Sequence, residues 1–190
     1  MIDNNLSVYL IGPSNAGISN LWNHGKINEN DYNSYIYNIA NIVNNSFSVV
    51  GCIPDISVPF DIVTEISKLP NKKVKIQGFF PKYGDDLNLS EKKELLDELI
   101  GIEGGWSKMN TEISKNFDLV ICCGLSAGVF TEISHTKVHR LWCNKITPIL
   151  IDERVISSHL NVELEKDVCL KYFNSDEELQ KIINQYMEGK

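Results

Sequence analysis

Arginine is scarce in this chain, and its scarcity limits how the protein recognises charged partners. Among the 190 residues only Arg140 and Arg154 are arginines, against sixteen lysines, and the formal net charge is −7. Arginine supplies the planar fork that binds a phosphate through two parallel hydrogen bonds. A net negative charge also repels a nucleic-acid backbone and an anionic membrane surface. We therefore expect no nucleic acid and no membrane among the partners.

Long apolar runs are also absent. No stretch approaches the ~20 apolar residues that cross a bilayer, and the N-terminus lacks the basic and apolar regions of a signal peptide. These absences predict a cytoplasmic protein. With 43% hydrophobic residues the chain is long enough to bury a full core, so we expect residues 1–190 to form one domain.

The five cysteines lack the CxxC spacing of metal and redox sites. Adjacent Cys122 and Cys123 would point to opposite faces of a strand, so we do not expect them to pair. Glu132, His135 and His139 share one helical face, but spacing places no further histidine or cysteine beside them. We therefore expect no metal and no cofactor, and we interpret this face as solvated.

Strand-like and helix-like segments alternate along the chain. Expected strands cover 7–12, 47–51, 73–80, 118–123 and 146–152, with 168–173 as a short edge strand. Expected helices cover 31–44, 59–69, 90–100, 107–115 and 126–143, and a last one begins at Ser175 with Glu178 completing a capping box. This alternation predicts an α/β fold, a doubly wound Rossmann-like parallel sheet flanked by helices on both faces.

Small residues form a turn after the first strand and another after the fourth. The first turn is Gly12-Pro13-Ser14-Asn15-Ala16-Gly17, and the second runs from Gly124 to Gly128 and opens the helix that carries Glu132. With the strand order 3-2-1-4-5, the first and fourth strands are neighbours at the topological switch point, where such sheets bind ligands. A helix N-terminus attracts phosphate through unpaired N–H groups and the helix dipole. The sequence therefore predicts a nucleotide or phosphosugar site between the turns.

Structural interpretations of the same residues stay open. Gly124 and Gly128 would also let a strand and a helix approach closely, and Ser14 would also form a simple turn. Glu132, one turn into its helix, would also complement the helix dipole as a surface acid.

Several landmarks recur in a known order over residues 6–152. They are Ile11-Gly12-Pro13-Ser14 after strand one, Gly51 after strand two, Gly78-Phe79-Phe80-Pro81 at the end of strand three, the segment from Gly124 to Glu132, and the segment from Leu141 to Ile149. Together they resemble the LONELY GUY and SLOG superfamily of Rossmann-like nucleotide-binding proteins, often labelled lysine decarboxylases. Gly124 to Glu132 stands where that superfamily has Pro-Gly-Gly-x-Gly-Thr-x-x-Glu.

The resemblance implies a ligand, a reaction and an assembly. Active members are phosphoribohydrolases that cleave the N-glycosidic bond of a nucleoside 5′-monophosphate, and relatives commonly form homodimers with the pocket at the two-fold interface. Glu132 matches the catalytic glutamate, whose carboxylate would stabilise oxocarbenium-like charge. The turns and the resemblance together assign nucleotide and phosphate binding to Gly12, Pro13, Ser14, Asn15, Gly51, Asn110, Gly124, Leu125, Ser126, Ala127, Gly128 and Val129.

The chain departs from the superfamily's pattern at positions that serve catalysis. Met109 stands where an arginine is expected, Leu125-Ser126 replaces the paired glycines, and Val129 replaces the threonine. Backbone amides at a helix N-terminus need no particular side chain, so ligand binding should survive these changes better than hydrolysis. The sequence thus predicts a protein that binds a nucleotide or a nucleotide-derived, phosphoribosyl-type ligand and has a degenerate catalytic motif.

Three alternatives stay open. One is a working phosphoribohydrolase, with Lys108 in place of the missing arginine. Another is a nucleoside deoxyribosyltransferase-like enzyme, because such proteins also begin with a strand into Gly-Pro and place a nucleophilic glutamate after an Asp-Leu-Val strand. The third is a purely structural or interaction role.

Overall fold

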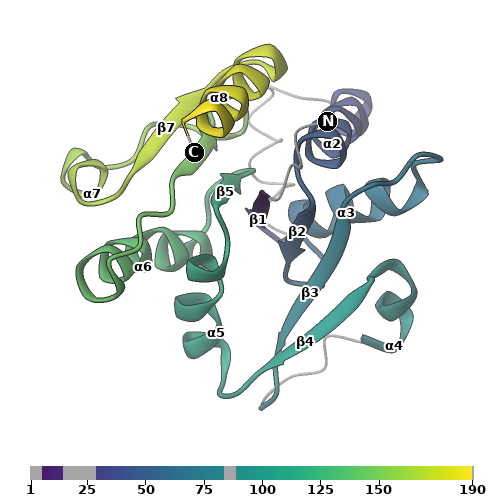
Figure 1. Cartoon of the computed structure of the whole chain (residues 1–190), viewed down its shortest axis with the longest axis horizontal. Coiled ribbons are helices and arrows are strands. Elements are labelled where there is room, and N and C mark those ends of the chain that lie inside the picture. The colour runs from purple at the N-terminus through teal and green to yellow at the C-terminus, as the bar shows by residue number, and fades with distance from the viewer. Residues whose placement is uncertain (1–5, 15–28, 84–88, 190) are drawn as a thin grey trace.

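The fold is built on one sheet of seven parallel strands, in the order β4-β3-β2-β1-β5-β6-β7 (Figure 1). The structure is a computed structural model that describes residues 6–14, 29–83 and 89–189. The strands are β1 (Ser7–Ile11), β2 (Val49–Cys52), β3 (Lys75–Pro81), β4 (Glu98–Ile102), β5 (Leu119–Cys122), β6 (Ile149–Asp152) and β7 (Leu170–Phe173). This sheet confirms the predicted doubly wound α/β fold, including the neighbouring positions of the first strand and the strand that begins near residue 118.

Helices cover both faces of the sheet. They are α2 (Glu29–Ser46), α3 (Val58–Lys68), α4 (Leu89–Lys92), α5 (Trp106–Glu112), α6 (Ala127–Cys143), α7 (Val162–Asp167) and α8 (Asp176–Glu188), with short 3-10 turns η1 (Lys93–Leu95), η2 (Ser114–Asn116) and η3 (Glu153–Val155). Figure 1 shows α2, α3 and α8 on one side of the sheet and α5, α6 and α7 on the other. Because side chains alternate along a strand, Val8 and Leu10 enter the core between the sheet and α2, α3 and α8, and Tyr9 and Ile11 enter the core between the sheet and α5, α6 and α7.

Serine side chains cap the N-termini of α6 and α8, where the sequence predicts that these helices begin. The Ser126 hydroxyl accepts a hydrogen bond from the Val129 N–H at 3.3 Å, and the Ser175 hydroxyl accepts one from the Glu178 N–H at 3.1 Å. The Glu178 carboxylate in turn accepts the N–H of Asn174 at 2.9 Å. Each cap satisfies an N–H that the helix itself leaves unpaired.

The predicted helix over 90–100 is wrong in its second half. Helical structure there ends at Leu95, and β4 begins at Glu98. Side chains fix the new strand against β3: the Asp97 carboxylate accepts the Ile76 N–H at 2.7 Å, and Glu98 accepts a hydrogen bond from Gln77 at 2.8 Å. Pairing with β3 therefore decides the structure of this segment.

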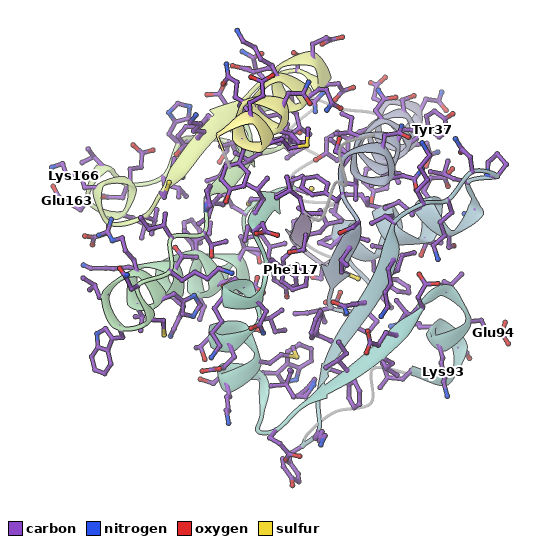
Figure 2. The ribbon with its side chains drawn as sticks, in the orientation of Figure 1. Tyr37, Lys93, Glu94, Phe117, Glu163 and Lys166 are labelled. Atoms are coloured by element: carbon purple, nitrogen blue, oxygen red, sulfur yellow. The ribbon has the colours of Figure 1, made fainter. Side chains whose placement is uncertain are left out.

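Charged side chains point outward at the periphery. Figure 2 shows Lys93 and Glu94 on η1, and Glu163 and Lys166 on α7, all of them exposed. Of the helices in the described part of the chain, none is both long enough and apolar enough to cross a membrane.

Candidate functional site

The turns after β1 and β5 lie against each other at the carboxyl edge of the sheet. Gly124 has a φ of +120°, and a Cβ added there would lie 2.9 Å from Cδ of Pro13. A Cβ on Gly12 would lie 2.9 Å from Cδ of Pro59 and 3.3 Å from the carbonyl oxygen of Cys123. The two contacts at 2.9 Å are too short for a side chain, so glycine allows the turn after β5 to meet Pro13 and the turn after β1 to meet Pro59.

Glu132 lies one turn into α6 and is buried beneath this junction. Its side chain is only 6% exposed, and its Oε1 accepts a hydrogen bond from the Tyr9 hydroxyl at 3.1 Å. The interpretation of Glu132 as a surface acid is therefore wrong. Among the described residues, Tyr9 is the one hydrogen-bond partner of this carboxyl group.

An aromatic cluster fixes the position of the Tyr9 hydroxyl. The Tyr9 ring stacks on Phe117, with centroids 5.4 Å apart, and meets the edge of Phe79 at 6.4 Å. Phe117 lies in the interior of the molecule (Figure 2). A Cβ on Gly51 would lie 2.2 Å from Cζ of Phe117. Gly51 therefore makes room for the ring that supports Tyr9, and through it the hydrogen bond to Glu132.

Burial controls the charge of the carboxyl groups at the site. Desolvation raises the pKa of Glu132 from 4.5 to about 8, the hydrogen bond from Tyr9 opposes this rise, and the charge of Asp55 adds to it. Desolvation also raises the pKa of Asp55, although the Ser57 hydroxyl, the Asp55 N–H and the Lys92 ammonium all favour its charged form. At neutral pH Glu132 is therefore mostly a neutral acid.

A small cavity adjoins both carboxyl groups. Its volume is about 30 Å³. One water molecule occupies roughly 10–15 Å³ on this measure, so the cavity has room for about two water-sized groups. It is lined by Tyr9, Leu10, Ile11, Gly12, Ile53, Asp55, Ser57, Pro59 and Glu132.

Asp55 lies in the loop between β2 and α3, which is tied to the turn after β1. Ser14 and Ser57 form an antiparallel bridge, and the Val58 N–H donates to the carbonyl of Pro13 at 3.2 Å. The Ser57 hydroxyl also donates to the Asp55 carboxylate. The ends of β1 and β2, the loops that follow them, and Glu132 of α6 thus converge on the cavity.

The predicted phosphate-binding residues occupy several different environments. Gly12 lines the cavity together with Glu132, and Ser14 lies at the exposed bridge to Ser57. Ala127 and Gly128 are exposed in the first turn of α6. Among the described residues outside its immediate chain neighbours, a Cβ on Gly128 would meet only the Ser126 hydroxyl, at 3.9 Å, so no packing contact with them requires glycine there.

Other predicted residues lie away from the cavity. Val129 is buried in the core between α6 and the sheet, and Leu125 packs half-buried against the same core. Gly51 lies inside β2 against Phe117. Asn110 lies on α5, and its buried Oδ1 has no hydrogen bond within the part of the chain that the structure describes. Asn15 lies outside the described residues.

Sequence reasoning missed Tyr9, Asp55 and Ser57 as site residues. A signal for Asp55 was present, because an acidic residue after the second strand of a dinucleotide-binding sheet commonly receives a ribose hydroxyl. Tyr9 had a weaker signal: it is a hydroxyl-bearing side chain just before the Gly-Pro turn.

The face shared by Glu132, His135 and His139 is only partly solvated, which corrects our interpretation of it. Glu132 and His139 are buried, and His135 is half-exposed. His139 Nε2 lies 2.5 Å from the carbonyl oxygen of Thr111, and His135 Nδ1 lies 2.8 Å from that of Thr131. Within the described ranges, no three side chains of the metal-ligating kinds come together.

Comparison with known proteins shows a similar fold in proteins of very different sequence. No protein-family model and no curated protein matches this chain. Two structures of the molybdenum cofactor carrier protein from Chlamydomonas reinhardtii have TM-scores of 0.61 and 0.60 at 11% and 12% identity, over 97% and 98% of this chain and 99% of theirs. The X-ray structure of a protein designated TM1055 has a TM-score of 0.64 at 13% identity, over 95% of this chain and 99% of its own. These similarities establish the Rossmann-like fold.

Proposed function

We propose that this protein binds a nucleotide or a nucleotide-derived, phosphoribosyl-type ligand where the turns after β1 and β5 meet, and that it holds the ligand without converting it. The observation that carries the proposal is the buried Glu132 carboxyl group facing a small cavity at this junction. Open α/β sheets bind ligands at this edge because the loops diverge from the carboxyl ends of the strands there. A buried carboxyl group that faces a cavity is also typical of a functional site.

The exposed first turn of α6 provides the phosphate end of the proposed site. Glycine in a helix costs roughly 0.5–1 kcal/mol relative to alanine, yet no packing contact with the part of the chain that the structure describes requires Gly128. A bare backbone lets a ligand approach the N–H groups of this turn closely. The dipole of the 17-residue helix favours an anion at the same place.

The side chains around the site favour binding over hydrolysis. Met109, at the position of the arginine expected from the resemblance, is fully buried in the core, and Val129 is 2% exposed. Neither supplies a charge or a hydroxyl group to a reacting ligand. Lys108 is exposed on α5. The similarity in fold to a protein described as a cofactor carrier agrees with a binding role.

Thermal unfolding in the presence of nucleotides tests this proposal. The panel contains nucleoside monophosphates, cyclic nucleotides and ADP-ribose, and each mixture is also analysed by mass spectrometry. A ligand at a hundred times its dissociation constant should add about 2.7 kcal/mol to the stability of the folded state and raise the midpoint of unfolding. We expect stabilisation without product. The absence of a shift with every nucleotide would contradict the proposal.

Cleavage of an N-glycosidic bond is the second candidate function. The hydrogen bond from Tyr9 favours it, because it orients Glu132 toward the cavity that Glu132 lines. The ionised carboxylate would stabilise the positive charge that develops on the sugar as the bond breaks. Release of free base and ribose 5-phosphate from a monophosphate would identify a hydrolase. Exchange of bases between deoxynucleosides would identify a deoxyribosyltransferase.

We also propose that two copies of the chain pair through α6. Five large apolar side chains are exposed on this helix and just beyond it, and Trp142 is the most exposed of them at 84%. They are Phe130, Val138, Leu141, Trp142 and Ile146. Such a stripe can pack against its own copy across a two-fold axis, which makes the interface self-complementary. Because α6 begins at the site, this pairing would bring the two sites close to the interface.

A further inference from the structure

We propose that Lys92 and Asp55 together recognise the base of the ligand, and that this base has the hydrogen-bonding edge of guanine, a carbonyl oxygen followed by a ring N–H and an amino group. The inference rests on the proposed function and specifies the base of its nucleotide. Lys92 is the last residue of α4, and Asp55 lies in the loop between β2 and α3.

The Lys92 ammonium group lies beside this loop, at the carboxyl end of β2. It donates to the carbonyl oxygen of Pro54 at 2.8 Å and lies over the ring of Phe60, 5.4 Å from its centroid. Within the described part of the chain Lys92 forms no ion pair, whereas Lys72 and Lys82 each bind a carboxylate. An ammonium group carries several N–H donors, so Lys92 can still donate to a ligand.

Asp55 supplies acceptors next to this donor. Although burial raises the pKa of Asp55, the Ser57 hydroxyl, its own N–H and the charge of Lys92 favour its ionised form. Asp55 also lines the cavity of about 30 Å³, which has room for about two water-sized groups. The amino group of a base is water-sized, so it can enter the cavity while the ring stays at its mouth.

The order of donor and acceptor selects the base. An ammonium group only donates hydrogen bonds, and a carboxylate only accepts them. Guanine presents a carbonyl oxygen to the donor and two neighbouring N–H groups to the acceptor. Adenine presents the reverse, an amino group and an unprotonated ring nitrogen, and would leave both charged groups of the protein without partners.

A base fits between these two groups better than a phosphate does. The carboxylate of Asp55 would repel an anion bound at Lys92. The same loop also offers apolar surface to the flat face of a base, because Ile56, next to Asp55, is 66% exposed. Lys92 therefore acts as a hydrogen-bond donor to a neutral ring, and the phosphate lies elsewhere.

The position of the pair agrees with a phosphate at the first turn of α6. In the sheet, β1 separates β2 from β5, the strand that leads into α6. Neighbouring strands are about 4.8 Å apart, so the loop after β2 and the start of α6 are separated by on the order of 10 Å. A purine nucleotide reaches over a similar distance from its phosphate to the far edge of its base.

Calorimetric titration with purine 5′-monophosphates tests the inference on the full chain. Guanosine monophosphate should bind about tenfold to a hundredfold more tightly than adenosine monophosphate, the effect of a lost hydrogen bond to a charged group. Inosine monophosphate, which lacks the amino group, should lie between them. Equal affinities for the guanosine and adenosine forms would overturn the inference and leave the proposed function intact. Binding of no nucleotide would remove both.

Two variants assign the preference to its residues. In Asp55→Asn the amide can donate where the carboxylate accepts, so xanthosine monophosphate, with a carbonyl in place of the amino group, should gain about tenfold relative to guanosine monophosphate. Lys92→Met should reduce the preference for guanosine over adenosine monophosphate severalfold. A purely structural lysine would instead weaken both nucleotides equally.

Lys93→Met is the matched control for Lys92→Met. Lys93 is the next residue in the chain, and its exposed side chain points outward from η1 (Figure 2). It should keep the preference of the unmodified protein. Unchanged ratios of affinity in both Lys92→Met and Asp55→Asn would contradict the inference, and the comparison of purines on the unmodified protein needs no variant to fold.

Discussion

At the scale of single residues, the buried Glu132 carboxyl group makes stability depend on pH. The folded state keeps its proton up to about pH 8, whereas an ordinary glutamate loses it near 4.5. Tighter proton binding by Glu132 in the folded state stabilises the fold. This stabilisation is fully present below pH 4.5 and is lost as pH rises through 8, on the order of a few kcal/mol in total. Glu132→Gln cannot lose a proton, so its stability relative to the unmodified protein should increase from pH 5 to pH 9.

Urea denaturation at pH 5, 7 and 9 measures this difference. Glu65→Gln, which changes an acid in a surface ion pair, serves as the control and should follow the unmodified protein at each pH. Parallel stability curves for Glu132→Gln and the unmodified protein would contradict the prediction.

Replacing Gly124 or Gly128, the two glycines of the turn after β5, with alanine should change the stability of the fold by very different amounts. Gly124→Ala forces a side chain onto a residue with a φ of +120° and against Pro13, so it should destabilise the fold by about 1–3 kcal/mol. Gly128→Ala makes only an ordinary contact with the Ser126 hydroxyl among the described residues and should leave stability within roughly 0.5 kcal/mol or raise it. Urea denaturation gives both values. Weaker nucleotide binding in the stable Gly128→Ala variant would fit the proposed phosphate end.

Only part of the site was predictable from individual residues. Glu132 and the two turns stand out because strands, small residues and a helix start follow one another in the sequence. The role of Gly51 was hidden, because it acts through Phe117 and Tyr9, and these contacts join segments far apart in the chain. Asp55 is one of many acids in loops until the cavity shows which carboxyl group it faces.

At the scale of secondary structure, one arginine joins three elements. Arg154, just after β6, donates to both oxygens of the buried Asp152 at 3.0 and 2.8 Å and to Asp176 of α8 at 2.8 Å. Asp176 also accepts from Asn38 of α2 at 2.8 Å. The guanidinium group lies over the ring of Tyr35, 5.4 Å from its centroid. This network fixes α8 and α2 against the sheet.

Removing the arginine should therefore destabilise the fold strongly. Arg154→Met leaves the fully buried Asp152 carboxylate without its partner, which should cost about 3–5 kcal/mol in the free energy of unfolding. The double variant with Asp152→Asn should recover a large part of this loss, since no buried charge then remains. Chemical denaturation of the single and double variants measures both. A loss below 1 kcal/mol in Arg154→Met would show that the network contributes little.

Strand β4 shows where local sequence patterns fail. Leu95, Leu96, Leu99 and Ile100 have the spacing of a buried helical face, and the lysines and glutamates around them favour helices. The edge of β3 offers N–H and C=O groups that a strand can satisfy, and this pairing is not visible in a local window. The central strands were predictable because they are short, apolar and followed by turns.

At the scale of the whole molecule, the exposed face of α6 should decide the oligomeric state. Trp142→Lys places a charge in the proposed interface, at its most exposed apolar side chain, and should convert a dimer to a monomer in sedimentation equilibrium. Tyr37→Lys is the control, because Tyr37 is also exposed and aromatic but lies on α2, away from this stripe (Figure 2). An unmodified protein that sediments as a monomer at high concentration would contradict pairing through α6.

The pairing of β1 with β5 also has a kinetic consequence. Ser7 donates two hydrogen bonds to Asp118, 111 residues further along the chain, at 2.9 and 2.8 Å. Contacts between such distant segments close large loops and slow the folding of a chain. The junction that forms the site is thus complete only when both halves of the sheet have joined. A ligand held there binds after the folding barrier is crossed, so it prolongs the lifetime of the folded protein without hastening its formation.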